Sequence, residues 1–262
     1  MPTAAEIEKS LFDLAPKAGA MEWDNVGLLV GDPAAEISRV LVALDATEAV
    51  AEEAIAKGCQ LIVAHHPIMN CKWLPVQSLR ADTPQGKLLR RLTQTNISVI
   101  CMHTNLDVAD GGVNDELAHT LRLEDPGPFL EDGLGRIGSL SAPMALGDFV
   151  ARVSEVLHCS GVRYADAGKP VLRVAVGGGA CGEYVDAATA AGCDTFVTAD
   201  LSYHAFLDAA GKGINLIDAG HFPTEDPVCG VLIAYLQRQF PMLTVEKSAS
   251  HREVIQFYVK GE

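Results

Sequence analysis

The sequence predicts an α/β fold made of two similar α/β modules, each with a mixed or parallel sheet covered by helices. Continuous apolar runs alternate with helical patterns, which is typical of parallel strands buried on both faces. The same strand–helix–strand plan also occurs twice along the 262 residues. A segment rich in Gly and Pro at residues 126–139 separates the two copies.

The first module begins with a helix whose start is marked by the capping-box spacing of Thr3 and Glu6. A second helix is expected over residues 48–57, with Thr47 as its N-cap and Gly58 at its end. Thr83 and Pro84 open a third helix. The apolar runs expected to form strands are residues 26–30, 40–44, 61–64 and 97–102.

The second module repeats this plan. Residues 39–64 align without gaps with residues 173–198, and a helix from Ser202 and a strand at 214–217 follow. A repeat of this length favours duplicated domains over a solenoid, although all strand–helix–strand units share this generic pattern. We therefore expect one module over residues 1–128 and 222–262, and the other over residues 129–221.

Composition excludes several classes of protein. Lys and Arg number 20 and Asp and Glu number 34, a net charge of −14, which argues against a binder of duplex nucleic acid. With 48% hydrophobic residues the chain can bury a core. It has no apolar run long enough to cross a membrane and no signal-peptide pattern. The number of cysteines is odd and no Cys-x-x-Cys occurs, which argues against a disulfide scaffold or a zinc ribbon. We expect a cytoplasmic protein that does not associate with membranes.

Three of the expected strand ends carry residues that bind metals. His65 and His66 end one strand, His103 and Asp107 follow another, and His221 is followed by Glu225 after a third. Ligands of open α/β sheets bind beyond the carboxyl ends of the strands. Imidazole with carboxylate suits Zn, Mn, Fe, Co or Ni rather than Ca. Each group alone has a structural alternative, such as a helix-capping Asp, and only their joint occurrence predicts a metal site.

Other polar residues near these strand ends have two interpretations each. Asp45 could orient an imidazole or cap the following helix, and His103 could be a general acid or base or a buried polar residue. His204 is expected at the surface. The run Gly177–Gly182 fits the dinucleotide pattern G-x-G-x-x-G, but a tight turn is favoured over phosphate binding, and an NAD-dependent oxidoreductase is rejected. Arg136 could meet an anion or a neighbouring subunit, although an internal salt bridge is favoured.

Four segments together resemble the Nif-three-like dinuclear-metal-centre family, whose members are often described as GTP cyclohydrolase I type 2 homologues. The matching segments are residues 22–28, 64–67, 103–107 and 220–225. The resemblance spans nearly the whole chain and implies a short form without the domain that longer members insert. It further implies a toroidal homohexamer, a trimer of dimers.

The resemblance also implies two divalent metal ions per chain, at a site between the two modules. The implied metal ligands are His65, His66, Asp107, His221 and Glu225. Glu225 would bridge both ions, with His66 and Asp107 at one ion and His65 and His221 at the other. Some members carry a second His where this chain has Phe222, so a ligand from that position is not expected.

The leading functional hypothesis is a metal-dependent hydrolase acting on a nucleotide or another small polar molecule, with Glu225 and His103 as catalytic residues. Two metal ions can activate water and polarise a carbonyl or phosphoryl group. A GTP cyclohydrolase-like reaction is the version that the resemblance implies. The alternative is a non-catalytic hexamer that serves as a metal-binding scaffold, an adaptor or a metal store.

Overall fold

The computed structural model describes residues 1–258, and the chain forms two compact units. Unit 1 comprises Met1–Asp110 and Cys229–Arg252, and unit 2 comprises Gly111–Val228 together with the C-terminal residues from Glu253. The predicted division at 128/129 and 221/222 remains a prediction about domains, because compactness alone does not define a part of the chain that folds independently.

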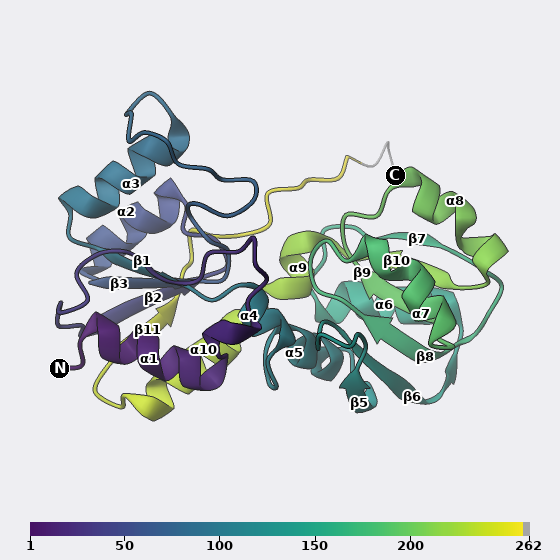
Figure 1. Cartoon of the computed structure of the whole chain (residues 1–262). Helices are drawn as coiled ribbons and strands as arrows, with labels where there is room; N and C mark the ends of the chain where they lie inside the picture. Colours follow the sequence, from purple (N-terminus) through teal and green to yellow (C-terminus); the bar gives the residue numbers. More distant parts are fainter. Residues whose placement is uncertain (259–262) are drawn as a thin grey trace. The chain divides into compact units, whose positions relative to one another are not determined.

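Unit 1 contains a five-stranded sheet in the order β1-β4-β3-β2-β11 (Figure 1). β1 pairs with β4 antiparallel, and the other three pairs are parallel. The three central strands are almost fully buried, as their continuous apolar sequences predict. The strands are β1 (Gly27–Val30), β2 (Arg39–Ala43), β3 (Leu61–Ala64), β4 (Ser98–Cys101) and β11 (Thr244–Lys247).

Helices cover both faces of this sheet, with α2 and α3 on one side and α1 and α10 on the other (Figure 1). The predicted caps are confirmed: Thr3 completes a capping box, and Thr47 and Thr83 accept hydrogen bonds from the first turns of α2 and α3. Gly58 ends α2 with φ +65°. The helices are α1 (Ala4–Leu14), η1 (Lys17–Gly19), α2 (Glu48–Lys57), α3 (Pro84–Gln94), α4 (Thr104–Val108) and α10 (Val228–Gln239).

Unit 2 contains a six-stranded mixed sheet in the order β5-β6-β8-β9-β10-β7. The pairs β8–β9 and β9–β10 are parallel, and the outer pairs are antiparallel. The Gly- and Pro-rich segment forms the β5–β6 hairpin, and its prolines lie on edge strand β5, where a missing N–H is tolerated. The strands are β5 (Glu124–Pro128), β6 (Arg136–Met144), β7 (Arg163–Ala165), β8 (Val171–Val176), β9 (Thr195–Thr198) and β10 (Asn215–Asp218).

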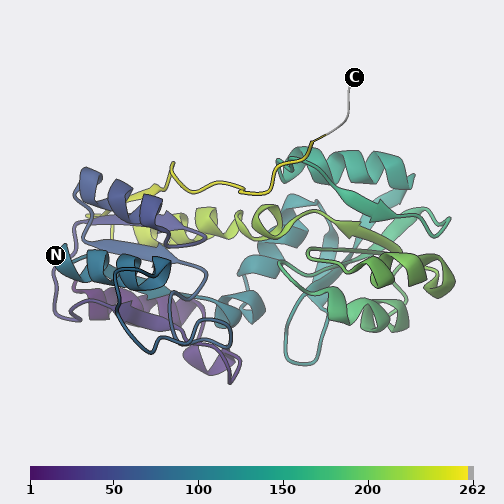
Figure 2. The same cartoon turned by 90° about the horizontal axis from the view of Figure 1, so that it is seen from above.

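The helices of unit 2 also lie on both sides of their sheet, and Figure 2 shows α6 and α8 on opposite sides of the strands. α5 and α6 bury Leu117, Phe149 and Val153 against β8, β9 and β10. The helices are α5 (Val113–Thr120), α6 (Leu146–Val156), η2 (Gly182–Tyr184), α7 (Val185–Ala190), α8 (Tyr203–Lys212) and α9 (His221–Glu225). No helix in residues 1–258 is long and apolar enough to cross a membrane.

Both units contain three adjacent parallel strands in chain order, β2-β3-β4 in unit 1 and β8-β9-β10 in unit 2. This arrangement agrees with the internal repeat and confirms the predicted mixed α/β fold. It also means that the carboxyl ends of the three strands meet at one edge of each sheet, where ligands of such folds bind.

Candidate metal centre

His65 and His66 follow the last residue of β3, and their backbone N–H groups both donate to the carbonyl oxygen of Leu44. This pair of hydrogen bonds turns the chain at the strand end. The His65 side chain is fully buried, and its Nδ1 lies 2.8 Å from the carbonyl oxygen of Met102. A carbonyl can only accept, so Nδ1 carries the proton and Nε2 is the nitrogen that can coordinate a cation.

Asp45 performs the same function for His66. Its Oδ1 lies 2.8 Å from His66 Nδ1, and its Oδ2 lies 3.0 Å from Nε2 of His251. Burial opposes ionisation of Asp45, but the two imidazoles outweigh it and hold the pKa of the carboxyl well below its usual range. Asp45 therefore orients an imidazole, as one interpretation of the sequence expected, and Thr47 provides the cap of α2.

Asp107 lies in the short helix α4, directly after β4, and is buried. Its Oδ1 is 3.5 Å from Nε2 of His65, so the structure brings together a carboxylate and an imidazole that the sequence predicts as ligands. A ring nitrogen of His103 also lies within 4.8 Å of ring nitrogens of His65 and His66. Unit 1 therefore presents three imidazoles and one carboxylate at the carboxyl ends of β3 and β4.

His103 is buried and is held by a residue of the 22–28 segment to which the sequence patterns assigned no role. Its Nδ1 lies 2.8 Å from Oδ1 of Asp24, whose Oδ2 accepts hydrogen bonds from the backbone N–H and the hydroxyl of Thr104. Burial of Asp24 opposes its ionisation, yet these partners lower its pKa to about 2. An ionised Asp24 favours the Nδ1-protonated tautomer of His103.

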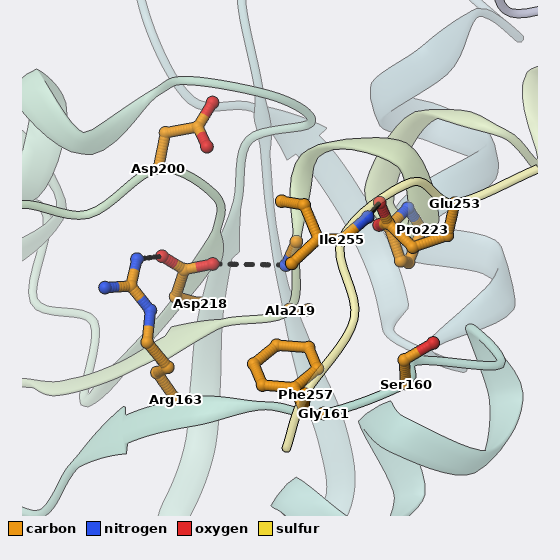
Figure 3. Close-up of a pocket in the computed structure, with 11 residues that line it drawn as sticks. Ser160, Gly161, Arg163, Asp200, Asp218, Ala219, Pro223, Glu253, Ile255 and Phe257 are labelled. Carbon is orange, nitrogen blue, oxygen red and sulfur yellow. Dashed lines mark hydrogen bonds and ion pairs between the residues drawn. The ribbon is translucent and has the colours of Figure 1, made fainter.

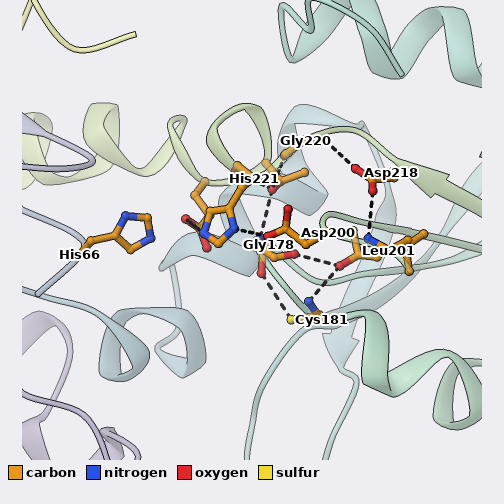
Figure 4. A network of polar contacts seen from close by, with 12 residues as sticks. His66, Gly178, Cys181, Asp200, Leu201, Asp218, Gly220 and His221 are labelled. Carbon is orange, nitrogen blue, oxygen red and sulfur yellow. Dashed lines mark hydrogen bonds and ion pairs between the residues drawn. The ribbon is translucent and has the colours of Figure 1, made fainter. Parts of the chain in front are cut away.

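In unit 2, His221 and Glu225 are the first and last residues of α9, and His221 Nε2 is 3.1 Å from Glu225 Oε2. The other ring nitrogen, Nδ1, lies 2.7 Å from Oδ2 of Asp200, a bond drawn in Figure 4. Burial disfavours the imidazolium, but Asp200 and Glu225 outweigh it and raise the pKa of His221 to about 11. Two carboxylates around one imidazole stabilise positive charge at this site. A bound cation can supply that charge in place of the second ring proton of His221.

The Gly177–Gly182 loop packs against Glu225. The N–H groups of Gly178 and Gly179 donate to the side chains of Asn114 and Thr224, at 2.9 and 3.0 Å. Gly179 has φ +64°, and a Cβ there would overlap Glu225 Oε1. These N–H groups are already bonded within the chain, so the geometry favours the predicted tight turn over phosphate binding. The turn gives Glu225 the space that it occupies.

Each unit has a pocket at the ligand-binding edge of its sheet. In unit 1 a pocket of about 310 Å³ is bordered by His66, Asp45 and the first turns of α2 and α3. In unit 2 a cavity of about 150 Å³ lies at the end of β10 beside Asp200 and Gly220, and Glu253, Ile255 and Phe257 border it (Figure 3).

Two expectations from the sequence are confirmed away from these groups. His204 is exposed, next to Tyr203. Arg136 is buried in an internal ion pair with Asp115, and its Nη1 donates to the carbonyl oxygens of Gly133 and Gly135. The residues that sequence patterns did not connect with the site are Asp24, Asp200 and His251. Two of them have a sequence signal: Asp200 stands where His66 stands in the first copy of the repeat, and Asp24 lies in the 22–28 segment that resembles the family.

The fold and these side chains define a class of mixed α/β proteins whose strand ends present imidazole and carboxylate groups suited to metal ions. The family model described as Duf34/NIF3 (NGG1p interacting factor 3) matches residues 2–253, and the chain belongs to this family.

Similar proteins agree with this assignment. A Streptomyces coelicolor relative named GTP cyclohydrolase 1 type 2 homolog is 37% identical over 248 residues, which cover 90% of this chain and 86% of the relative. A Clostridium acetobutylicum relative with the same name is 35% identical, with 86% of each chain covered. Among solved structures, a Bacillus cereus protein related to NIF3 superimposes with a TM-score of 0.91, at 25% identity over 98% of this chain and 99% of the other. A Staphylococcus aureus hypothetical protein gives 0.89, at 30% identity with the same coverage.

Proposed function

We propose that this protein holds two divalent metal ions with His65, His66, Asp107, His221 and Glu225 and uses them to hydrolyse a nucleotide or another small polar molecule. The observation that carries the proposal is shared by His65, His66 and His221. Each has Nδ1 within 2.8 Å of an oxygen acceptor. This arrangement fixes the ring and leaves Nε2 as the coordinating atom, as in metal sites in general.

The donor set fits transition metals. Imidazole nitrogens and carboxylate oxygens suit Zn, Mn, Fe, Co or Ni, whereas Ca takes oxygen ligands alone. In each unit the structure shows Nε2 of a histidine close to a carboxylate oxygen, His65 to Asp107 and His221 to Glu225. Such pairs concentrate negative charge beside a neutral nitrogen donor, which is the chemistry that a divalent cation requires.

The chain's own residues would divide the remaining work. A pair of divalent ions, when bound, supplies a water nucleophile at neutral pH and polarises the electrophile. Glu225 has two oxygens and could bridge both ions. His103 has its Nδ1 proton fixed by Asp24, so its Nε2 is the atom that could take or give a proton during the reaction. The relatives named GTP cyclohydrolase 1 type 2 homolog make a guanine nucleotide the first substrate to try.

The test combines metal analysis with a hydrolase screen of protein purified with its native metal. We expect up to two transition-metal ions per chain, and fewer than one would contradict the dinuclear centre. Turnover should fall at least about 100-fold in Glu225→Ala and remain unchanged in the exposed control Glu155→Ala. Equal rates in Glu225→Ala and the wild type would show that the activity came from elsewhere. Bound metal without turnover of any substrate would favour the scaffold or metal-storage alternative.

The oligomeric state belongs to the same proposal. We propose a homohexamer, as the family resemblance implies, and light scattering should give six times the mass of one chain. A monomer mass in dilute buffer would contradict it.

A further inference from the structure

The chain has two tryptophans, and both lie in unit 1 beside the histidines. The rings of Trp23 and Trp73 have centroids 5.3 Å apart, and each meets the His103 ring nearly edge-on, at 5.9 and 5.8 Å. The His103 ring in turn lies 5.1 Å from His65 and 5.6 Å from His66. The two indoles and three imidazoles therefore form one continuous aromatic cluster.

The two tryptophans remain unusually open for such large apolar side chains. Trp23 is 40% exposed and Trp73 is 53% exposed, whereas the imidazole of His103 beneath them is buried. An indole face in water forgoes the stabilisation that burial would give it. The two indoles are tilted by 51° to each other beside the buried His103, and together they offer exposed aromatic surface that a ligand can cover.

The chain around each tryptophan is fixed by hydrogen bonds. Asp24, next to Trp23, is bound to His103 and Thr104, and the Asn25 side chain donates to the carbonyl oxygen of Met69. Trp73 lies on a loop closed by the N–H of Asn70 donating to Leu74 and by the Asn70 side chain accepting from Val76. These hydrogen bonds hold the backbone that carries the two indoles, which lowers the ordering cost of binding.

The loop that carries Trp73 also borders the pocket of about 310 Å³ beside His66, through Leu74. This volume is at the lower end of the range for sites of small organic ligands. The other walls are mostly apolar, with Pro67, Ile68 and Leu88 among them. Neither tryptophan lines this pocket, but the pocket leaves room for a small ligand next to the loop that carries Trp73.

We propose that Trp23 and Trp73 form a stacking platform for the planar aromatic heterocycle of a small-molecule ligand, beside the histidines that bind metal. Stacking on an indole face needs a ring with π-electrons and tolerates many heterocycles, as aromatic platforms for nucleic-acid bases show. If the protein is the proposed hydrolase, the platform identifies its substrates as molecules that contain an aromatic heterocycle, and this part of the inference rests on the proposed function. Binding of the ring itself does not require metal.

The experiment is equilibrium dialysis of the full chain with adenosine and, separately, guanosine, with and without chelation of metal. Nucleosides lack phosphate, so contact between phosphate and metal cannot produce the binding. We expect saturable binding of both nucleosides and none of ribose. Trp73→Ala should weaken binding at least about fivefold, the lower end of the cost of losing a stacking residue. Trp73→Phe should retain binding within about twofold, and Tyr203→Ala, which removes an exposed aromatic of unit 2, should bind like the wild type.

Several results would overturn the proposal. One is that the wild type shows no saturable binding of nucleosides, and another is that Trp73→Ala binds nucleosides with the same affinity as the wild type. Binding of tetramethylammonium in place of nucleosides would also overturn it, because this result would indicate a cage for cations. A lower assembly mass in Trp73→Ala would assign the tryptophans to a subunit interface. If Trp73→Ala fails to fold, quenching of the wild-type tryptophan fluorescence by nucleosides decides the matter. The platform and the hydrolase can fail separately. If the protein binds nucleosides through Trp73 but holds no metal and turns over no substrate, the platform stands and the hydrolase is refuted. If it holds metal and turns over a substrate but binds no nucleoside, the hydrolase stands and the platform is refuted.

Discussion

Nδ1 of His66 lies 2.8 Å from Oδ1 of Asp45, while His251 lies against the other oxygen of the same carboxylate. Asp45 thus fixes the ring of His66 from the end of the neighbouring strand.

Asp45→Asn keeps the shape of the side chain but replaces the charged acceptor. We expect metal affinity to fall about 10- to 100-fold, the usual effect of removing the partner of a metal-binding histidine. Competition with a chelator of known affinity measures this, and the exposed control Asp13→Asn should bind like the wild type. Unchanged affinity in Asp45→Asn would argue against His66 as a ligand.

Gly179 provides a test of Glu225 that leaves the carboxylate in place. Gly179 and Gly192 both have positive φ, +64° and +76°, so alanine should strain either backbone by roughly 1–2 kcal/mol. Only at Gly179 would the new Cβ overlap Glu225, since Gly192 has open space around it. We expect both alanine variants to lose stability and Gly179→Ala alone to lose bound metal. Thermal unfolding and metal analysis check the pair, and equal metal content would contradict the position given to Glu225.

Asp24 should make stability depend on acid pH. Its folded-state pKa of about 2 lies below the ordinary value near 3.8. A carboxyl with a depressed pKa stabilises the fold at pH values above the ordinary value, and this contribution is lost as the pH falls from about 5 to about 1, through the folded-state pKa. Asp24→Asn should therefore cost about 2 kcal/mol at pH 6, and the difference from the wild type should be small at pH 2 and vanish near pH 1. Urea unfolding across this range measures the effect. A constant difference at all pH values would refute it.

Arg136 should be important for the stability of unit 2. It is only 4% exposed, and its charge is balanced by Asp115 and two backbone carbonyls. Arg136→Met removes the cation and leaves these acceptors in the interior, so we expect a loss of about 3–5 kcal/mol. The double variant Arg136→Met with Asp115→Asn should recover part of this loss. Denaturant unfolding measures both, and strictly additive losses would show that the pair does not interact.

The central strands and their helix caps could be predicted because the signals are local. The apolar runs at β2, β3 and β4 are buried as continuous sequences, and Thr3, Thr47 and Thr83 lie next to the helices that they cap. β11 was not expected, because its partner β2 lies about 200 residues earlier and pairing over that distance leaves no local pattern.

The candidate site shows the same limit. Adjacent histidines at the end of a strand and the spacing of His221 and Glu225 are visible in the sequence. Asp45, the partner of His66, is visible as well, because it ends the neighbouring strand. The partners of His103 and His221 are not, since Asp24 is 79 residues from His103 and Asp200 is 21 residues from His221. Such pairs depend on which strand ends lie side by side, and therefore on the folded sheet rather than on spacing along the chain.

The pairing of β2 with β11 has a consequence for synthesis of the chain. All six strands of the unit 2 sheet lie between Glu124 and Asp218, so all of them are translated before β11. Until residue 247 emerges, the nascent protein carries β2 with one hydrogen-bonding edge uncovered. An uncovered apolar edge invites pairing with other chains. The emergence of β11 therefore determines how long β2 needs protection from aggregation.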